Sequence, residues 1–354
     1  MITFERVTKD FPGGLRAVDS LELTVEKGEI SVLIGPSGCG KTTTMRLVNR
    51  LITLTSGRIT VDGRDNREAA PEDLRRKIGY AIQQIGLFPH MTIGQNVAVV
   101  PRLLGWEETR IRKRIDTLLE LVGLDPDGHR DKYPRQLSGG QQQRVGVARA
   151  LGADPPIMLM DEPFGAVDPI TRSVLQDEFL QIQATIAKTV LFVTHDIDEA
   201  IKMGDRVAVM KEGRLVQYAE PDELLARPAD EFVRAFVGAD RELKRLGLVR
   251  VRDVMSPPNG TEVGEGEAAV SENASVRDAL STLVGRGFEA TPVVDSERRV
   301  TGLITLEALR AAIESGRAAD ARRAADARRA TDAQTGRGAA TQGAAEDGSG
   351  GSGS

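Results

Sequence analysis

The residues best suited to chemistry form a glycine-rich loop near the N-terminus. Its sequence is Gly35-Pro36-Ser37-Gly38-Cys39-Gly40-Lys41-Thr42, followed by Thr43. An apolar run, Ile30–Ile34, precedes the loop, and apolar residues at helical spacing follow it. This order of strand, loop and helix is the context that a phosphate-binding loop requires. Its backbone N–H groups would surround phosphate oxygens, Lys41 would reach the β and γ phosphates, and Thr42 would offer its hydroxyl to Mg²⁺.

Two adjacent carboxylates, Asp161 and Glu162, follow a second apolar run at residues 157–160. They would stand at the carboxyl end of a strand, where ligands of open α/β sheets bind. We expect Asp161 to hold Mg²⁺ through water and Glu162 to polarise the water that attacks the terminal phosphate. An acidic pair alone more often marks an exposed strand end, but the upstream phosphate loop favours the chemical interpretation.

A second potential phosphate site lies further along the chain. The sequence Leu137-Ser138-Gly139-Gly140-Gln141 precedes a helix-like stretch at residues 142–151. Ser138 and the two glycines would form a helix N-terminus whose N–H groups favour an anion. A single phosphate-loop domain does not need two such sites.

Composition limits the partners. The 354 residues carry 47 Lys and Arg against 52 Asp and Glu, a formal net charge of −5, which gives no electrostatic reason to bind nucleic acid. The apolar runs are far shorter than the roughly 20 residues that span a bilayer. The single cysteine, Cys39, excludes an intrachain disulfide, and with no visible secretory signal it indicates a reducing cytosol.

The elements that must position these residues fall into three regions. Residues 1–240 alternate short apolar runs with helical stripes, which predicts an α/β core with parallel strands buried on both faces. Residues 249–315 carry a smaller βα pattern, with a helix capped by Ser275, two strands at 291–294 and 300–304, and a last helix capped by Thr305. Residues 316–354 are poor in large apolar side chains, and we expect them to be disordered.

Together, the phosphate loop, the Leu-Ser-Gly-Gly-Gln segment, the Asp-Glu strand and His195 after the next apolar run resemble the nucleotide-binding subunit of an ATP-binding-cassette (ABC) transporter. The resemblance covers residues 1–240. It implies a P-loop NTPase fold with a RecA-like core, an antiparallel β subdomain and a helical subdomain. It also implies ATP and Mg²⁺ as cofactors, and a head-to-tail pair of chains in which the segment of one closes over ATP on the other.

The resemblance assigns further roles. Phe11 stands where an aromatic stacks on adenine, and Gln83 where a glutamine joins Mg²⁺ and links hydrolysis to the membrane partner. Asp168 corresponds to a loop that communicates across the dimer, and His195 to a switch histidine on the γ-phosphate. Phe at position 11 replaces the commoner Tyr, and Gly165 and Val167 replace Ser and Leu. Taken alone, Phe11 would more simply be a core aromatic, and Gln83 a polar loop residue.

A narrower resemblance concerns cargo. Residues 83–93, 160–166 and 228–233 resemble the branch that imports glycine betaine, choline, carnitine or proline. Residues 249–315 resemble one cystathionine-β-synthase (CBS) module, either a regulatory surface that binds a nucleotide or senses ionic strength, or a packing module. The resemblance implies permease subunits contacted through residues 84–91, an extracytoplasmic binding protein, and a place on the cytoplasmic face of the plasma membrane. Export and a soluble ABC ATPase stay open as alternatives.

Overall fold

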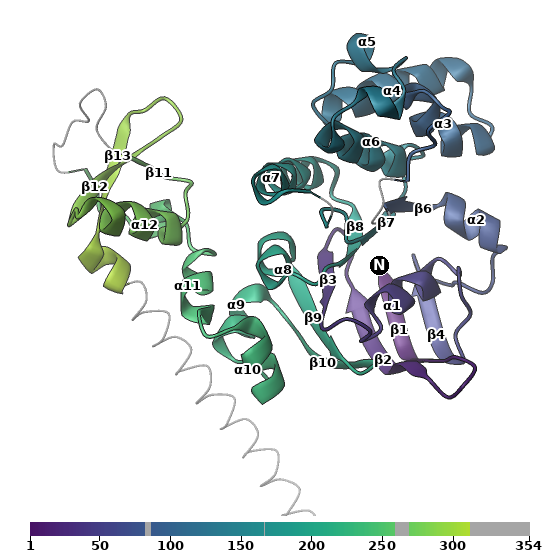
Figure 1. The fold of residues 1–354 in the computed structure, drawn as a ribbon, viewed down its shortest axis with the longest axis horizontal. Helices are drawn as coiled ribbons and strands as arrows, with labels where there is room; N and C mark the ends of the chain where they lie inside the picture. Colours follow the sequence, from purple (N-terminus) through teal and green to yellow (C-terminus); the bar gives the residue numbers. More distant parts are fainter. Residues whose placement is uncertain (82–85, 166, 259–268, 312–354) are drawn as a thin grey trace, which may run out of the picture. The chain divides into compact units, whose positions relative to one another are not determined.

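The computed structural model describes residues 1–81, 86–165, 167–258 and 269–311 (Figure 1). Contacts divide the chain into two compact units, Met1–Ala239 and a second unit that begins at Asp240. The tail predicted to be disordered, residues 316–354, lies outside the described residues. In the described part of the chain, no helix combines the length and the apolar character that a membrane crossing requires.

The larger sheet of the first unit has the strand order β10-β9-β3-β8-β7-β6. Its strands are β3 (Ile30–Ile34), β6 (Ile78–Ala81), β7 (Ile157–Asp161), β8 (Thr189–Val193), β9 (Arg206–Lys211) and β10 (Arg214–Ala219). Neighbours pair in parallel except β9 and β10, which are antiparallel. Every residue of β3, β7 and β8 is buried, as continuous aliphatic runs in a covered parallel sheet should be. The α/β core predicted from those runs is confirmed.

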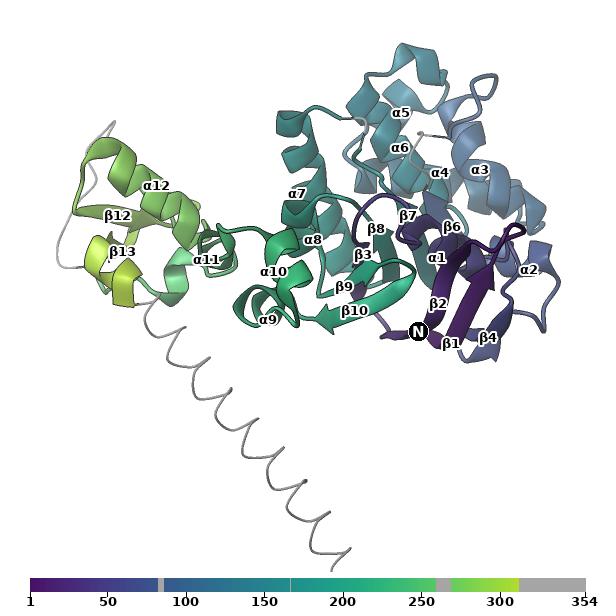
Figure 2. The same ribbon diagram turned by 60° about the horizontal axis from the view of Figure 1, so that its bottom comes forward.

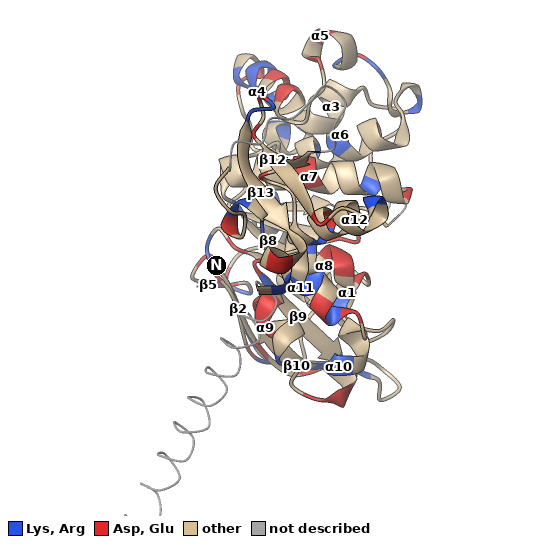
Figure 3. Ribbon diagram, turned by 90° about the vertical axis from the view of Figure 1, so that its left-hand side faces the viewer, with Lys and Arg blue, Asp and Glu red and all other residues tan. Residues whose placement is uncertain are grey.

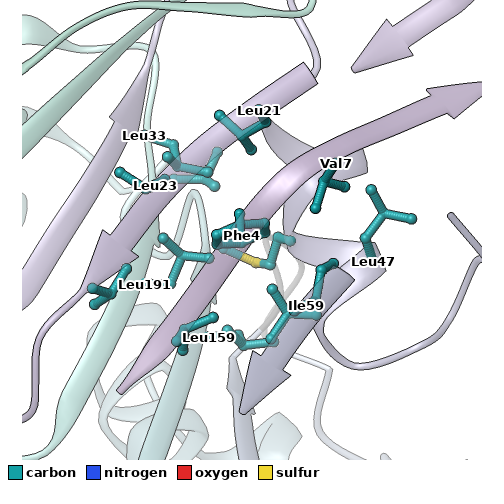
Figure 4. Close-up of a cluster of buried hydrophobic side chains, with 14 of the residues drawn as sticks. Phe4, Val7, Leu21, Leu23, Leu33, Leu47, Ile59, Leu159 and Leu191 are labelled. Atoms are coloured by element: carbon teal, nitrogen blue, oxygen red, sulfur yellow. The ribbon is translucent and has the colours of Figure 1, made fainter. Parts of the chain in front are cut away.

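A second, antiparallel sheet packs against the first. Its strands are β1 (Ile2–Asp10), β2 (Arg16–Val25), β4 (Ser56–Val61) and β5 (Arg64–Asp65), in the order β2-β1-β4-β5. Figure 4 shows Phe4 of β1 and Ile59 of β4 facing Leu159 and Leu191 of the larger sheet. Since these side chains form one buried cluster with Leu47 of the first helix, the two sheets share a hydrophobic core.

Some helices of the first unit pack on the sheets, and others pack on one another. The bounds in the first unit are α1 (Lys41–Val48), α2 (Pro71–Arg76), α3 (Ile93–Leu103), α4 (Glu108–Leu121), α5 (Pro126–His129), the 3₁₀ turn η1 (Pro134–Gln136), α6 (Gly139–Leu151), α7 (Pro169–Ile186), α8 (Ile197–Met203), α9 (Pro221–Ala226) and α10 (Glu231–Val237). Helices α3 to α6 pack together as a helical subdomain (Figure 2). The RecA-like, antiparallel and helical parts expected from the resemblance are all present.

The second unit is small. It contains α11 (Arg241–Leu246), the 3₁₀ turn η2 (Val251–Asp253), β11 (Val270–Ser271), α12 (Val276–Arg286), β12 (Ala290–Val294) and β13 (Val300–Thr305), with the strand order β11-β12-β13. Ser275 caps α12 and the Thr305 hydroxyl accepts from the backbone N–H of Ala308, as the sequence predicts. Leu246, Leu283 and Ile304 are buried in one core, so α11 belongs with this unit.

Charged residues of both signs are interspersed along the ribbon, and α4 carries both (Figure 3). This distribution agrees with the nearly balanced count of acidic and basic residues. Acidic and basic residues are therefore mixed in the folded structure as they are in the sequence.

Candidate nucleotide site

The loop between β3 and α1 is built around three glycines with positive φ angles. They are Gly35 at 152°, Gly38 at 80° and Gly40 at 105°. A Cβ on Gly35 would lie 2.2 Å from the carbonyl oxygen of Met210, and one on Gly40 would lie 2.3 Å from that of Ala17. Because both contacts are with backbone, no larger residue fits either position without moving the loop.

The crest of this loop is exposed at Pro36, Ser37 and Gly38, and α1 begins at Lys41. The Lys41 side chain is buried, and its ammonium donates to the carbonyl oxygens of Gly35 at 2.6 Å and Pro36 at 3.1 Å. A helix N-terminus and a lysine therefore meet under an exposed loop, which is a suitable arrangement for phosphate oxygens. Cys39 is buried in the hydrophobic core, in keeping with its interpretation as a small structural side chain.

Strand β7 delivers its last residue, Asp161, to the start of α1. The hydroxyl of Thr42 donates to the Asp161 carboxylate at 3.2 Å. Burial raises the pKa of Asp161, and the neighbouring charge of Glu162 adds to this shift, while the hydrogen bond from Thr42 opposes it. A hydroxyl and a carboxylate are hard oxygen donors, and Mg²⁺ commonly uses only one or two protein ligands besides phosphate and water. The pair therefore fits Mg²⁺.

Glu162 and His195 lie against each other at the ends of β7 and β8. The Nδ1 atom of His195 is 3.2 Å from Oε2 of Glu162. The backbone N–H of Glu162 donates to the carbonyl of Val193 at 2.9 Å, and its φ angle of 46° is in the left-handed region. Such a conformation costs a non-glycine residue about 1–3 kcal/mol, and strained backbone of this kind clusters at active sites. The His195 side chain is 62% exposed, so this pair is open to a ligand.

Ser138 begins α6 with a capping box. Its hydroxyl accepts from the N–H of Gln141 at 3.3 Å, and the Gln141 side chain accepts from the N–H of Ser138 at 3.1 Å. Ser138 and Gly139 are exposed, which leaves this helix N-terminus accessible. The predicted N-cap at Ser138 is thus present in the structure.

Asp168 lies in the same hollow as this helix N-terminus. The hollow has a volume of ≈ 540 Å³, within the roughly 300–1,000 Å³ of ligand pockets. Its lining includes Ser138, Gly139, Gly140, Gln141, Asp168 and Thr171. Asp168 caps α7 by accepting from the N–H of Thr171 at 3.0 Å, and this hydrogen bond lowers the pKa of Asp168. None of the described lining residues belongs to the phosphate loop, so this hollow and that loop are separate features of one chain.

The sequence predicts three further residues at this site. Phe11 lies in the turn between β1 and β2, half-buried, with the Lys9 ammonium 4.9 Å from its ring centre. Gln83 lies outside the described residues, as do residues 82, 84 and 85, and Ala166, two residues before Asp168. Thr43 follows Thr42 in the first turn of α1 and is half-buried.

Two residues that sequence reasoning missed organise the segment after Gln83. Asn96 is fully buried and exchanges hydrogen bonds with the backbone of Phe88, while its amide also donates to the carbonyls of Met91 and Thr92. Arg149 of α6 donates to the carbonyl of Gly86. The Thr92 capping box locates the start of α3, but no local pattern distinguishes Asn96 or Arg149 from ordinary polar helix residues.

Comparisons with known proteins agree with this geometry. A family model described as ABC transporter matches residues 18–165, and one described as CBS domain matches residues 251–315. The osmoprotectant import ATP-binding protein OsmV of Salmonella typhimurium is 49% identical over 324 residues, which cover 90% of this chain and 82% of that protein. The chain belongs to the family of ABC transporter ATP-binding subunits.

Two further comparisons extend this result. The glycine betaine/carnitine/choline transport ATP-binding protein OpuCA of Bacillus subtilis is 49% identical to this ATP-binding subunit over 310 residues, covering 87% of this chain and 79% of that protein. A solved dimeric structure of the ATP-binding cassette MJ0796, bound to ADP and Pi after hydrolysis, is 32% identical with a TM-score of 0.55 and covers 62% of this chain and 99% of that one. The predicted ABC ATPase fold, the ATPase activity and the CBS domain are confirmed, as is the resemblance to the osmoprotectant branch.

Proposed function

We propose that this ATP-binding subunit powers the uptake of osmoprotectants of the quaternary-amine class, such as glycine betaine, choline, carnitine or proline. The observation that carries the proposal is the 49% identity to OsmV, whose name describes osmoprotectant import. The nucleotide site itself does not select cargo, so the cargo class rests on the relatives and not on the geometry.

Glu162 and His195 are the residues that we assign to hydrolysis. The Glu162 carboxylate stands at the end of β7, where it can accept a hydrogen bond from the attacking water and so orient it. His195 contacts the same carboxylate at 3.2 Å and is exposed, so its ring can contact a γ-phosphate while it steadies Glu162. Lys41 and the loop N–H groups bind the phosphates, and Phe11 would stack on the adenine.

Mg²⁺ would be held by the Thr42 hydroxyl and the Asp161 carboxylate, with Gln83 as a further ligand. When bound, the ion neutralises charge on the phosphates and holds them in position. The chain itself contributes the hydrogen bond between Thr42 and Asp161, at 3.2 Å, which holds the two oxygens next to each other at the start of α1.

A head-to-tail homodimer would complete two ATP sites. The phosphate loop and the hollow at Ser138 and Asp168 are separate in this chain, and each offers an exposed helix N-terminus or loop crest. Pairing two chains would bring the hollow of one chain over the phosphates bound by the other. The phosphate loop and the hollow would then both contact the same ATP. The dimeric form of MJ0796 supports this arrangement.

The membrane partner would be a pair of permease subunits, served by an extracytoplasmic substrate-binding protein, with this chain on the cytoplasmic face of the plasma membrane. We assign the permease contact to residues 84–91, of which 84 and 85 lie outside the described residues. Phe88 is 39% exposed although Asn96 fixes its backbone. An apolar side chain held in place at the surface suits a protein interface.

The CBS domain would regulate transport, either by binding an adenine nucleotide or by sensing ionic strength. Because α11 packs in the second unit, the domain should be removed from Asp240 onward and not within α11. Transport by the truncated subunit is then measured against external osmolarity. An unchanged osmotic response would leave the domain only a packing role.

The cargo proposal is tested by uptake of radiolabelled glycine betaine, choline, carnitine and proline into cells that lack this subunit and regain it. We expect uptake to return with the wild-type chain and not with Glu162→Gln, which retains the fold but cannot act as a base. Restored uptake by Glu162→Gln would contradict the assigned role of Glu162. Failure of every labelled compound to enter with the wild-type chain would contradict the cargo class.

A further inference from the structure

Helices α7 and α8 lie side by side (Figure 2), and each begins beside a residue of the nucleotide site. Helix α7 starts directly after its N-cap Asp168, and α8 starts directly after its N-cap Asp196. Asp196 is the residue that follows His195. A contact between the first turns of these helices would therefore relate the position of Asp168 to that of His195.

Arg172, in the first turn of α7, makes such a contact. One guanidinium nitrogen, Nη2, donates to the carbonyl oxygen of Val167 at 3.1 Å. The other, Nη1, lies 3.4 Å from Oδ2 of Asp196. The side chains of Arg172 and Asp196 are 28% and 35% exposed, so this ion pair is partly shielded from water. One planar group thus joins the backbone before Asp168 to the residue after His195.

Asp196 is itself fixed on its other side. Its Oδ1 accepts from the N–H groups of Asp198 and Glu199 at 2.9 and 3.2 Å, which caps α8. Its own N–H donates to the hydroxyl of Thr194 at 3.1 Å. His195 therefore lies between Thr194 and Asp196, which are joined by a hydrogen bond. Arg172 adds a hydrogen bond to Asp196 from α7.

Further polar contacts hold α7 against α8 beyond the first turn. The amide of Gln176 donates to the carboxylate of Glu199 at 3.0 Å, and both side chains are buried. The ammonium of Lys202 lies 2.9 Å from the carboxylate of Asp177. These contacts oppose a sliding movement of α7 along α8, so the distance between Arg172 and Asp196 is held by more than one interaction.

We propose that Arg172 is a positioning residue for ATP hydrolysis. It fixes the segment that ends at Asp168 relative to His195, and so sets the angle at which His195 meets Glu162. The proposal rests on the roles assigned to Glu162 and His195 under the proposed function. Arg172 acts only through its contacts with Val167 and Asp196, and it does not itself touch the nucleotide.

Arg114 provides a matched control. Like Arg172, it joins backbone carbonyl groups to a carboxylate: it donates to the oxygens of Leu151 at 2.9 Å and Gly152 at 3.2 Å, and to Asp154 at 3.2 Å. Its side chain is 25% exposed, close to the value for Arg172. It belongs to α4 in the helical subdomain, away from the residues that we assign to chemistry.

The experiment compares Arg172→Met with Arg114→Met in the full-length chain, measuring kcat and KM for ATP and the Tm of each variant. We expect both to lower Tm by similar amounts. Only Arg172→Met should lower kcat, by about 10-fold or more, because a misplacement on the order of 1 Å near reacting groups has effects of this size. KM should change less than twofold, since the phosphate loop is untouched. Equal kcat in the two variants would overturn the proposal.

Two further variants keep the test decisive if Arg172→Met does not fold. Arg172→Lys should recover part of kcat, because one hydrogen bond can still form. Asp196→Asn retains the cap of α8 but weakens the partner of Arg172, so it should lower kcat by itself. When Arg172→Met folds, combining the two substitutions should lower kcat no further. Full activity of Asp196→Asn, or additive losses in the double variant, would overturn the proposal.

The same assays on Glu162→Gln separate this inference from the function on which it rests. Near-normal turnover of Glu162→Gln would refute the assigned site. An inactive Glu162→Gln together with an Arg172→Met variant that matches Arg114→Met would refute the role of Arg172 alone.

Discussion

Replacing Ser138 with Arg tests whether ATP is shared between two chains. In the structure, Ser138 is exposed at the start of α6, within the hollow that also contains Asp168. A long cationic side chain there would occupy the space that the γ-phosphate of a partner-bound ATP needs. Since Ser138 and the phosphate loop are separate features of the chain, the variant should bind ATP at its own loop with unchanged affinity but should not close as a pair.

The cost to stability can be estimated from the contacts. Losing the hydrogen bond that the Ser138 hydroxyl accepts from Gln141 costs about 1 kcal/mol, while the bond donated by the backbone N–H of residue 138 is retained. A cation at the N-terminus of α6 adds about 0.3–1 kcal/mol. The sum stays below a typical domain stability of about 5–15 kcal/mol, so the chain should remain folded. Loss of a donor to the transferring phosphate should lower kcat on the order of 100-fold.

The assay measures steady-state ATPase activity, binding of a fluorescent ATP analogue, and dimerisation by light scattering in the hydrolysis-blocked Glu162→Gln background. Ser138→Ala is the control, because it removes the cap without adding bulk or charge. We expect Ser138→Ala to dimerise with ATP and Ser138→Arg to stay monomeric. Wild-type turnover by Ser138→Arg, or ATP-dependent dimers of it, would refute the shared site.

Three other changes have defined outcomes. Gly40→Ala places a Cβ 2.3 Å from the carbonyl oxygen of Ala17 at a φ of 105°, and it should weaken ATP binding by at least 10-fold in a fluorescence titration. The hydrogen bond from Arg67 lowers the pKa of Asp65 to about 2, so the contribution of this carboxylate to stability is complete above about pH 4 and is lost as the pH falls toward 2. The difference in Tm between wild type and Asp65→Asn should therefore become smaller from pH 4 to pH 2. A constant difference in Tm would contradict this. Asn96→Leu removes the bonds that fix Phe88 and should lower uptake more than ATPase activity, whereas equal losses would indicate a general defect.

Sequence alone predicted the parts of the site that are local. The glycines, Lys41 and Thr42 are contiguous, and the strand before them has a pattern that can only be buried. Ser138 with Gln141, and Ser275 with Asp278, form capping boxes that are visible in the sequence because both partners lie within one turn.

The contacts that organise the site from a distance could not be predicted in this way. Arg172 meets Asp196 through the packing of two helices, and Arg149 of α6 meets Gly86, which lies 63 residues earlier in the chain. In sequence, an arginine on a helix is more often part of a solvated face, and no spacing rule identifies its partner. Asn96 is similar, since its polarity suggests exposure while the structure buries it completely.

The burial of Cys39 has a practical consequence. It is the only cysteine of the chain, and its sulfur is buried 3.8 Å from the ammonium of Lys41. A thiol-alkylating reagent can reach it only when the surrounding backbone opens locally, so the labelling rate measures how often that happens. Because the chain has no second thiol, mass spectrometry of the intact wild-type protein can follow this local opening without background labelling. Nucleotides that stabilise the closed form of the loop should slow the reaction.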